Sequence, residues 1–594
     1  MTDPPVEYER RLGLWAARIE ELERTHLVIS NLRLLVAGVF VAMAWFAFAR
    51  STLAPAWPLL PAIAFGGLLI GHARLLNRAE RARRAHRLYQ RGLDRLEGQW
   101  AGTGMDGSRF LDDHPYARDL DLFGPGSLFE LINTARTEAG ESTLAGWLKG
   151  SAAINEVRAR QAAVDELRSR LDFREDLAVL ADEGKVSRTR AVAAWAASPP
   201  VAIGRLMPLL FGFCAAVLAA LAFLAYQGVV PWSLVFGWLL VEAALVRVSR
   251  RRTQLVMARV GKPADDLAIM TELLERVERE PLTAPRLSAV QAALQTGGVR
   301  ASRAIRRLTQ LVSLHESSVH NLLFMPFTSA LLVPDQLAIA IDRWHARHGP
   351  AVADWLRAVG DLEALSAIAT YAYEHTADPF PDLIDTGPLF HADGLGHPLI
   401  TDRVSVRNDV RLGSDAPHVI VVSGSNMSGK STLLRAIGTN VVLALAGAPV
   451  RAAALRLSPL AIGATLRIED SLRAGHSRFY AEIVRIRSIV DVARGPIPLL
   501  FLLDEILHGT NSYDRRIGAE GIVRALVGYG AIGLITTHDL ALTELPSLLG
   551  PKAVNRHFED RLENGVMVFD YRMRPGVVEH SNALALMRAI GLEV

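Results

Sequence analysis

Two pairs of long apolar runs, separated by charged sequence of helical pattern, dominate the chain. The first pair covers about 34–49 and 57–73, and a polar stretch with prolines divides it. The second pair covers about 206–226 and 230–246 and is joined by a short turn at Gln227-Gly228-Val229. Each run approaches the roughly 20 residues that a helix needs to cross a bilayer. We therefore predict two transmembrane hairpins; for the first pair, a buried hairpin in a soluble domain is the alternative.

Arginines beside the apolar runs predict how the hairpins are oriented. Six arginines follow the first hairpin between positions 74 and 87, and four follow the second between 247 and 252, whereas the connecting loops hold only Arg50. The positive-inside tendency then places both termini and the C-terminal domain in the cytoplasm, with the chain in the cell (inner) membrane. Glu242 is costly in lipid, so we expect it to face a neighbouring helix or the interface; a proton site is the alternative.

The remaining sequence is helical in pattern up to about residue 375, and after Pro379 it changes to short strands, turns and helices. We expect a multidomain protein with four transmembrane helices, an all-α domain and a C-terminal P-loop α/β domain. The expected units are residues 1–100 with the first hairpin, residues 101–378 as a helical domain interrupted by the second hairpin, and residues 379–594 as the α/β domain.

The amino-acid composition is consistent with this domain organisation. Half of the 594 residues are apolar, which supports membrane spans, and the formal charge of +3 gives no global attraction to nucleic acid. The single Cys214 excludes an internal disulfide and a thiolate metal cluster. Four arginines at 300–307 could touch phosphates, but a solvated helix face is the favoured interpretation.

The strongest candidate for chemistry is a glycine-rich loop between a β-branched strand (419–422) and a helix that begins near Thr432. Its residues are Gly424, Ser425, Asn426, Met427, Ser428, Gly429, Lys430 and Ser431, which match G-x-x-x-x-G-K-[ST] in the required context. Backbone N–H groups of such a loop surround the β-phosphate of a nucleotide. Lys430 would then bridge the β- and γ-phosphates, and the Ser431 hydroxyl would ligate Mg²⁺.

Two later strands end in polar residues that complete an ATPase site. Residues 499–503 form an apolar run that ends in Asp504-Glu505, where Asp504 would hold Mg²⁺ and Glu505 would polarise the attacking water. A strand-end cap is the alternative for this acidic pair. The run 531–535 ends in Thr536-Thr537-His538-Asp539, where His538 could contact the γ-phosphate.

A Ser- and Gly-containing segment at 471–477 lies between the loop and Asp504 and opens a helix. Such a segment is a possible anion site. Because the first loop already surrounds the phosphates of its own chain, this second site could serve the nucleotide of a partner, which predicts a composite dimer site.

Together these motifs resemble the MutS family of ATPases, and the resemblance covers the whole α/β domain. The similar segments are GSNMSGKST at 424–432, EDSLRAGHSRFYAEI at 469–483, LLDEILHGTNSYD at 502–514 and TTHD at 536–539. Further similar segments are the His-Pro turn at Gly396-His397 and the strand around His557. The resemblance implies ATP and Mg²⁺ as cofactors, ATP hydrolysis, Ser477 acting in trans in a homodimer, His538 as a switch, and His557 near adenine.

The resemblance extends to the helical region and also shows departures. Residues 119–167 resemble the start of the family's core or lever domain, and 361–372 resemble its closing helix. The mismatch-reading and connector domains have no room before the core, and the pattern shows the DNA-clamp insertion absent or much reduced. Ser405 stands where an aromatic residue over adenine is expected, and His508 stands where arginine is frequent.

The sequence thus predicts a membrane-anchored, MutS-like ATPase in which ATP binding and hydrolysis gate a dimeric clamp. The resemblance implies DNA, mismatched or branched, as the partner of this clamp. The lipid bilayer is a second expected partner. Two alternatives stay open. One is a mechanochemical or transport-coupled ATPase in which the four spans receive the motion. The other is a nucleotide-gated scaffold with negligible turnover.

Overall fold

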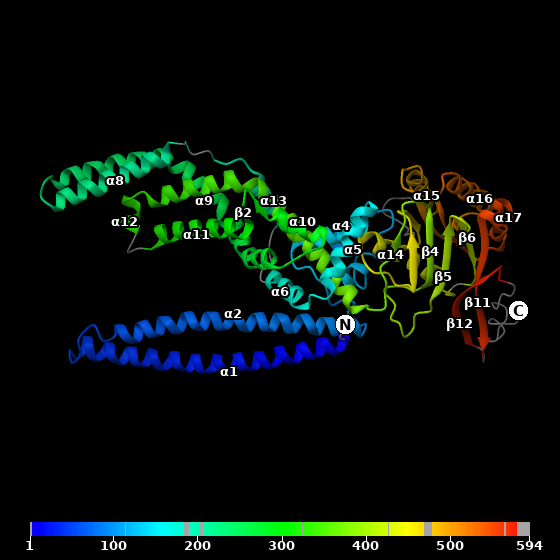
Figure 1. The fold of residues 1–594 in the computed structure, drawn as a ribbon, viewed down its shortest axis with the longest axis horizontal. Helices are drawn as coiled ribbons and strands as arrows, with labels where there is room; N and C mark the ends of the chain where they lie inside the picture. Colours follow the sequence, from blue (N-terminus) through cyan, green and yellow to red (C-terminus); the bar gives the residue numbers. More distant parts are fainter. Residues whose placement is uncertain are drawn as a thin grey trace.

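The computed structural model describes residues 3–112, 114–182, 189–201, 204, 206–321, 325–425, 427–467, 478–563 and 566–578. The molecule is elongated, with an α/β domain at one end and the tips of two helical hairpins at the other (Figure 1). The fold is multidomain and mostly helical with mixed sheets, as the sequence predicts.

The N-terminal hairpin consists of two long antiparallel helices. Helix α1 (Pro4–Ala44) continues through a π-helical turn (Trp45–Ala49) and returns as α2 (Leu59–Leu96). The charged segment and the apolar run that follows it therefore form one continuous helix. Midway along the hairpin, small residues such as Ala79 and Ala82 on α2 allow close packing against Leu22 on α1.

The helical region that follows packs around one buried helix, α13 (Val333–Glu374). The other helices are α3 (Leu128–Ile132), α4 (Glu138–Lys149), α5 (Ile154–Arg168), α6 (Leu171–Ala181), α7 (Thr189–Ala197), α8 (Met207–Tyr226), α9 (Trp232–Arg279), α10 (Pro285–Ala293), α11 (Ala301–His320) and α12 (Met325–Ala330). Strands β1 (Gln295–Thr296) and β2 (Val299–Arg300) form a small antiparallel pair. The second apolar hairpin is α8 and the first part of α9.

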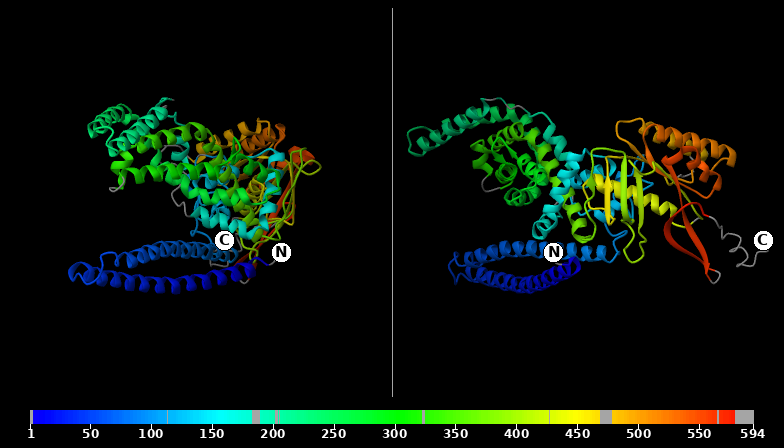
Figure 2. Two further views of the ribbon diagram at one scale, coloured as in Figure 1. Left: turned by 60° about the vertical axis from the view of Figure 1, so that its left-hand side comes forward. Right: turned by 45° about the vertical axis from the view of Figure 1, so that its right-hand side comes forward.

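Four helices of the described residues are long and apolar enough to cross a membrane, by length and composition. They are α1 with its π-helical turn, α2, α8 and α9, which carry the four predicted apolar runs. The α1–α2 and α8–α9 hairpins extend away from the α/β domain in the same general direction in all three views (Figures 1 and 2). Glu242 is buried within the protein, where α9 packs beside α8 and α13.

The α/β domain contains a six-stranded sheet in the order β12-β11-β6-β10-β9-β8. Its strands are β6 (Val419–Ser423), β8 (Ala461–Thr465), β9 (Leu499–Asp504), β10 (Ile532–Thr537), β11 (Ala553–Glu563) and β12 (Val566–Pro575). All neighbours are parallel except β11 and β12. A second sheet, in the order β3-β7-β4-β5, contains β3 (Asp382–Leu383), β4 (Leu389–Leu395), β5 (Asn408–Gly413) and β7 (Ala454–Leu457).

Helices cover both faces of the six-stranded sheet, and so its central strands are apolar throughout. Alternate residues such as Ile420 and Val422 belong to the core shared with α14 (Lys430–Ala446) and the helical domain. The residues between them, such as Val419 and Val421, pack with α15 (Arg478–Ala493) and α16 (Ser512–Gly528). The short helix α17 (Leu545–Leu549) precedes β11.

Asp119 joins the helical domain to the α/β domain. Its carboxylate accepts hydrogen bonds from the backbone N–H groups of Leu466 and Arg467, at 2.7 and 2.9 Å, and pairs with Arg485 at 2.8 Å. Nearby, α14 passes so close to Leu120 that a Cβ added at Gly438 would lie 2.5 Å from a Leu120 methyl carbon. The two domains are therefore in close contact through α14.

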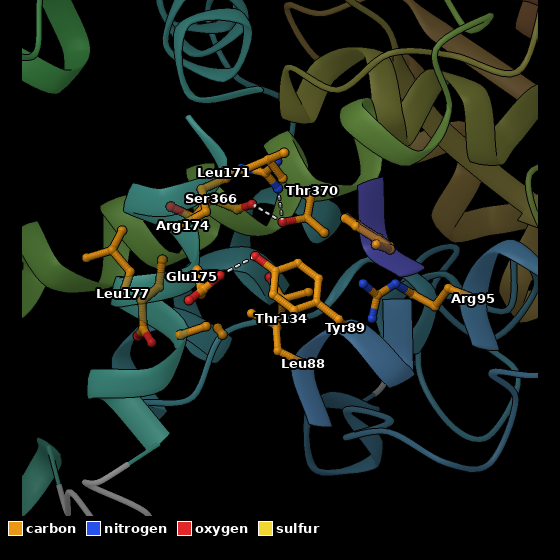
Figure 3. A pocket seen from close by; sticks show the side chains of 14 residues that line it. Leu88, Tyr89, Arg95, Thr134, Leu171, Arg174, Glu175, Leu177, Ser366 and Thr370 are labelled. Atoms are coloured by element: carbon orange, nitrogen blue, oxygen red, sulfur yellow. Dashed lines mark hydrogen bonds between the residues drawn. The ribbon is translucent and has the colours of Figure 1, made fainter. Parts of the chain in front are cut away.

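A second junction, at the base of the α1–α2 hairpin, fixes the hairpin to the helical domain. Arg95 of α2 donates to both carboxylate oxygens of Glu374, at 2.8 and 2.5 Å, and the Tyr8 hydroxyl donates to the same carboxylate at 3.2 Å. Tyr89 donates to Glu175 of α6 at 2.5 Å (Figure 3). Because Glu374 is the last residue of α13, the hairpin base lies at the entrance to the α/β domain.

Residues 173–175, which resemble a mismatch-reading sequence only by composition, belong to this junction. Phe173 is buried in the core, Arg174 donates to the Thr370 hydroxyl at 2.6 Å, and Glu175 accepts from Tyr89. These three residues therefore have a structural role in the helical core.

The buried Arg95–Glu374 pair predicts a large cost for removing one partner. We expect Glu374→Gln to lower the free energy of unfolding by about 3 kcal/mol, because it leaves the Arg95 guanidinium buried without its counter-charge. Glu20→Gln, which removes an exposed pair with Arg24, should change it by less than about 0.5 kcal/mol. Chemical denaturation of the full chain in detergent measures both changes. Equal changes in the free energy of unfolding would contradict a large contribution of the Arg95–Glu374 pair to stability.

Candidate functional site

The glycine-rich loop lies at the carboxyl end of β6, immediately before α14. Gly424 and Gly429 have φ of +154° and +102°, and Met427 has φ of +68°. A Cβ added at Gly424 would lie 2.9 Å from the Ser428 hydroxyl, so the tight turn there depends on glycine. Asn426 lies outside the described residues, and Thr432 is exposed in the first turn of α14. The predicted strand–loop–helix arrangement is confirmed.

Lys430 lies within this loop. Its ammonium group donates to the carbonyl oxygens of Gly424 and Ser425, at 2.8 and 2.7 Å. Burial lowers the pKa of Lys430, while the nearby carboxylates of Glu505 and Asp504 oppose that shift. The side-chain oxygens of Ser425 and Ser428 are buried without a hydrogen-bond partner among the described residues. The loop therefore brings a cation and two unused hydroxyls to the same place.

Asp504 ends β9 beside the start of α14. Its carboxylate accepts a hydrogen bond from the Ser431 hydroxyl at 2.6 Å and another from the Thr536 hydroxyl. Hydroxyl and carboxylate oxygens are hard ligands of the kind that Mg²⁺ prefers. Ser431 and Asp504 thus fit the predicted magnesium site, because they lie together although 73 residues separate them in sequence.

Glu505 and His538 meet at the same edge of the sheet. The Nδ1 atom of His538 lies 3.2 Å from Oε1 of Glu505. The backbone of Glu505 has φ of +49°, and its N–H donates to the carbonyl and the hydroxyl oxygen of Thr536, both at 3.2 Å. This turn directs the backbone away from the strand direction just after Asp504. A carboxylate beside an imidazole can accept a proton from water and hold it.

The structure adds two residues for which the sequence analysis assigned no role in the site. The Thr536 hydroxyl contacts both Asp504 and the backbone of Glu505, because Thr536 pairs in register with Asp504. His508 lies with its ring centroid 5.2 Å from that of His538. The sequence did contain a signal for Thr536. It ends an apolar strand in the TTHD motif, and the ends of adjacent parallel strands lie side by side, which places its hydroxyl beside the carboxylate of Asp504.

His557 lies on β11, directly opposite Ser423. The side chain is buried and its Nδ1 atom has no hydrogen-bond partner in the described part of the chain. Tyr571 of β12, which the sequence analysis did not identify, lies against the loop: a Cβ added at Gly429 would be 3.0 Å from its ring. His557 therefore lies one strand away from the start of the loop, and its expected place near adenine stays a prediction. Ser477 and the segment 471–477 fall outside the described residues.

Comparison with known families agrees with this geometry. Residues 420–593 match the family model of MutS domain V. A MutS domain V is present. DNA mismatch repair protein MutS 2 of Halobacterium salinarum is 32% identical over 235 residues, which are 39% of this chain and 27% of that protein. DNA mismatch repair protein MutS of Brevibacillus brevis is 30% identical over 253 residues, 41% of this chain and 29% of the relative.

The chain therefore spans less than a third of the length of these two relatives. The matched region contains the glycine-rich loop and the four residues Asp504, Glu505, His538 and His557, all of which the sequence analysis assigned to the site.

The different positions of Lys430 and Glu505 predict different defects. We expect Lys430→Ala to abolish ATP binding, because it removes the cation of the loop. Glu505→Ala should keep ATP binding and lower turnover by about 100-fold or more, the range for loss of a general base. Binding of a fluorescent ATP analogue and release of phosphate measure the two properties. Glu520→Ala, at a half-buried position of α16 where Glu520 pairs with Arg524, is the control; normal turnover of Glu505→Ala would contradict the role assigned to Glu505.

Thr536 gives a second prediction. Thr536→Val keeps the shape of the side chain but removes the hydroxyl that contacts Asp504 and Glu505, so we expect turnover to fall by about 10-fold, equivalent to about 1.4 kcal/mol. The Mg²⁺ concentration for half-maximal activity should rise. Thr536→Ser should restore most activity, and a Thr536→Val enzyme with unchanged turnover and Mg²⁺ dependence would exclude this role.

Proposed function

We propose that the protein is a membrane-anchored ATPase of MutS type. Its loop at 424–432 binds the phosphates of ATP, and Ser431 and Asp504 hold Mg²⁺, which neutralises charge on the phosphates. Glu505 activates the attacking water and His538 contacts the γ-phosphate. The observation that carries the proposal is the convergence of Lys430, Asp504, Glu505 and His538 at the carboxyl edge of three adjacent strands.

The active form in this proposal is a homodimer through the ATPase domain. Ser477 of one subunit completes the nucleotide site of the other, as the resemblance implies, and α15 begins immediately after this residue. Each site then needs Lys430 from one chain and Ser477 from its partner.

Subunit mixing tests this arrangement. Lys430→Ala and Ser477→Ala homodimers should both be inactive, whereas a mixture should recover about a quarter of wild-type turnover, because only mixed dimers contain one intact site. Steady-state phosphate release across a range of mixing ratios measures this. Lys430→Ala mixed with itself is the control, and no recovery at any ratio would argue against a shared site.

Both hairpins cross the cell (inner) membrane in this proposal, and the ATPase domain is cytoplasmic. The four apolar helices, the arginines that follow each hairpin and the similar direction of both hairpins support it. Helix α9 supplies the mechanical path. It runs without a break for 48 residues from the second hairpin into the core of the helical domain, roughly 70 Å at 1.5 Å per residue.

We propose DNA, mismatched or branched, as the partner of the helical arms. The support is the names of the relatives, which are DNA mismatch repair proteins. A second candidate is an ATPase whose output is movement of the membrane helices, without DNA. It is favoured by α9 and α13, because these helices connect the second hairpin with the core and with the entrance of the ATPase domain.

ATPase measurements on the full chain in nanodiscs separate these two outputs. For a DNA-acting enzyme, we expect mismatched or four-way-junction DNA to stimulate turnover several-fold over perfect duplex, with an effect that falls as salt rises. Glu505→Ala supplies the background rate. Turnover that responds to no DNA at either low or high salt would reject the DNA proposal and favour the membrane output.

A further inference from the structure

A cavity of about 260 Å³ lies where the base of the first hairpin meets the helical domain. Helix α2, the loop at 103–105, the segment before α4 and the end of α6 surround it. Its polar lining is unusually basic, with the four arginines Arg84, Arg87, Arg91 and Arg136 and the two carboxylates of Glu141 and Asp182. The site is separate from the ATPase loop, which belongs to another domain.

The carboxylates around the cavity already have partners. Asp182 lies 3.7 Å from Arg84, Glu80 pairs with Arg87 at 3.1 Å, and Glu141 pairs with Arg109 at 2.5 Å. The side chains of Arg91 and Arg136 make no ion pair or hydrogen bond within the described ranges. Two guanidinium groups that form no ion pair with the described residues therefore line one cavity.

Arg136 is the more buried of these two. Burial lowers its pKa, and repulsion from Arg91 adds to the effect, while Asp182 and Glu363 act in the opposite direction. The backbone N–H of Arg136 donates to the buried carboxylate of Glu363 at 3.0 Å, which fixes the chain at this point. A half-buried cation without a paired anion is costly, so a bound anion would stabilise this arrangement.

The lining also contains apolar side chains, those of Leu88, Met105 and Val179. A site that holds only inorganic phosphate needs no apolar side chains in its lining. We propose that the cavity binds a phosphorylated small molecule of the nucleotide class, with its phosphates on Arg91 and Arg136 and its ring against the apolar side chains of the lining. Guanidinium groups suit phosphate because their paired N–H groups match two of its oxygens.

The distance from the membrane favours a soluble ligand over a lipid headgroup. Arg91 lies 18 residues beyond Ala73, the end of the apolar run, which is roughly 27 Å along a helix. The ligand would contact α2 of the hairpin and the segment that enters α4. It would therefore bridge the membrane hairpin and the helical domain, and its concentration would control how firmly they are held together.

Calorimetric titration of the full-length Lys430→Ala protein in phosphatidylcholine nanodiscs tests this inference, because that substitution removes nucleotide binding at the ATPase loop. The probes are AMP, ADP, ATP and inorganic phosphate. We expect one equivalent of a nucleotide to bind per chain, and Arg136→Gln and Arg91→Gln each to weaken it about 10-fold, the loss of one charge-assisted contact. Arg136→Lys should retain part of the affinity.

Arg303→Gln, an exposed arginine on α11, is the matched control and should leave binding unchanged. Arg91 is exposed, so its variant tests the site even where Arg136→Gln fails to fold, as judged by thermal melting. No saturable binding of any probe up to about 1 mM, or affinity indifferent to both arginine substitutions, would overturn the proposal. Loss of nucleotide binding in nanodiscs that contain phosphatidylglycerol would indicate that a lipid headgroup occupies the cavity. That result would overturn the proposal of a soluble ligand.

Discussion

Burial of helix α13 is the constraint on which the rest of the structure depends. From Ala351 to Glu374 almost every position is buried, so this half of the helix must be covered on all sides. Helices α4, α5, α7, α9, α10 and α11 all pack against α13 along its length. Because α13 ends at Glu374, where Arg95 and Tyr8 of the hairpin converge, a single rigid element connects the core, the base of the hairpin and the entrance of the α/β domain.

The nucleotide site depends on a different constraint, the parallel alignment of β6, β10 and β9. Parallel strands present their carboxyl ends at one edge, so residues far apart in sequence meet there. Thr536 illustrates this: it pairs with Val422 of β6 on one side and with Asp504 of β9 on the other, and its hydroxyl contacts the Asp504 carboxylate. A shift of β10 by one residue would separate Thr536 from Asp504 and move His538 away from Glu505.

Much of this site could be predicted from sequence because its signals are local. The loop at 424–431 lies in one short segment, and each acid or histidine directly follows an apolar strand. The contacts that orient these groups are not local. His508 reaches His538 from a loop 30 positions earlier, and Tyr571 reaches Gly429 from the far edge of the sheet. Such contacts cannot be predicted from periodicity or from a motif, because they depend on the register and the order of the strands in the sheet.

The hairpin junction was even less predictable. Arg95 and Glu374 are 279 positions apart, and each occurs in ordinary helical sequence where a solvated charge would be the natural interpretation. The four apolar runs, in contrast, were evident from composition, because a helix that contacts lipid needs continuous apolar residues. The sequence therefore identified the hairpins as elements but not the place where the first of them is fixed.

Close packing between the domains limits how a change at the nucleotide can spread. Gly438 of α14 lies against Leu120 without room for a methyl group, and Asp119 holds the backbone before α15. Protein interiors are packed at near-crystalline density, so α14 cannot move toward the helical domain without displacing it. In the proposed function Lys430 contacts the phosphates and Ser431 holds Mg²⁺. Since α14 begins at these two residues, the first displacement caused by nucleotide would fall on this interface. The helical domain, held together around α13, would then move as a unit and carry the base of the hairpin with it.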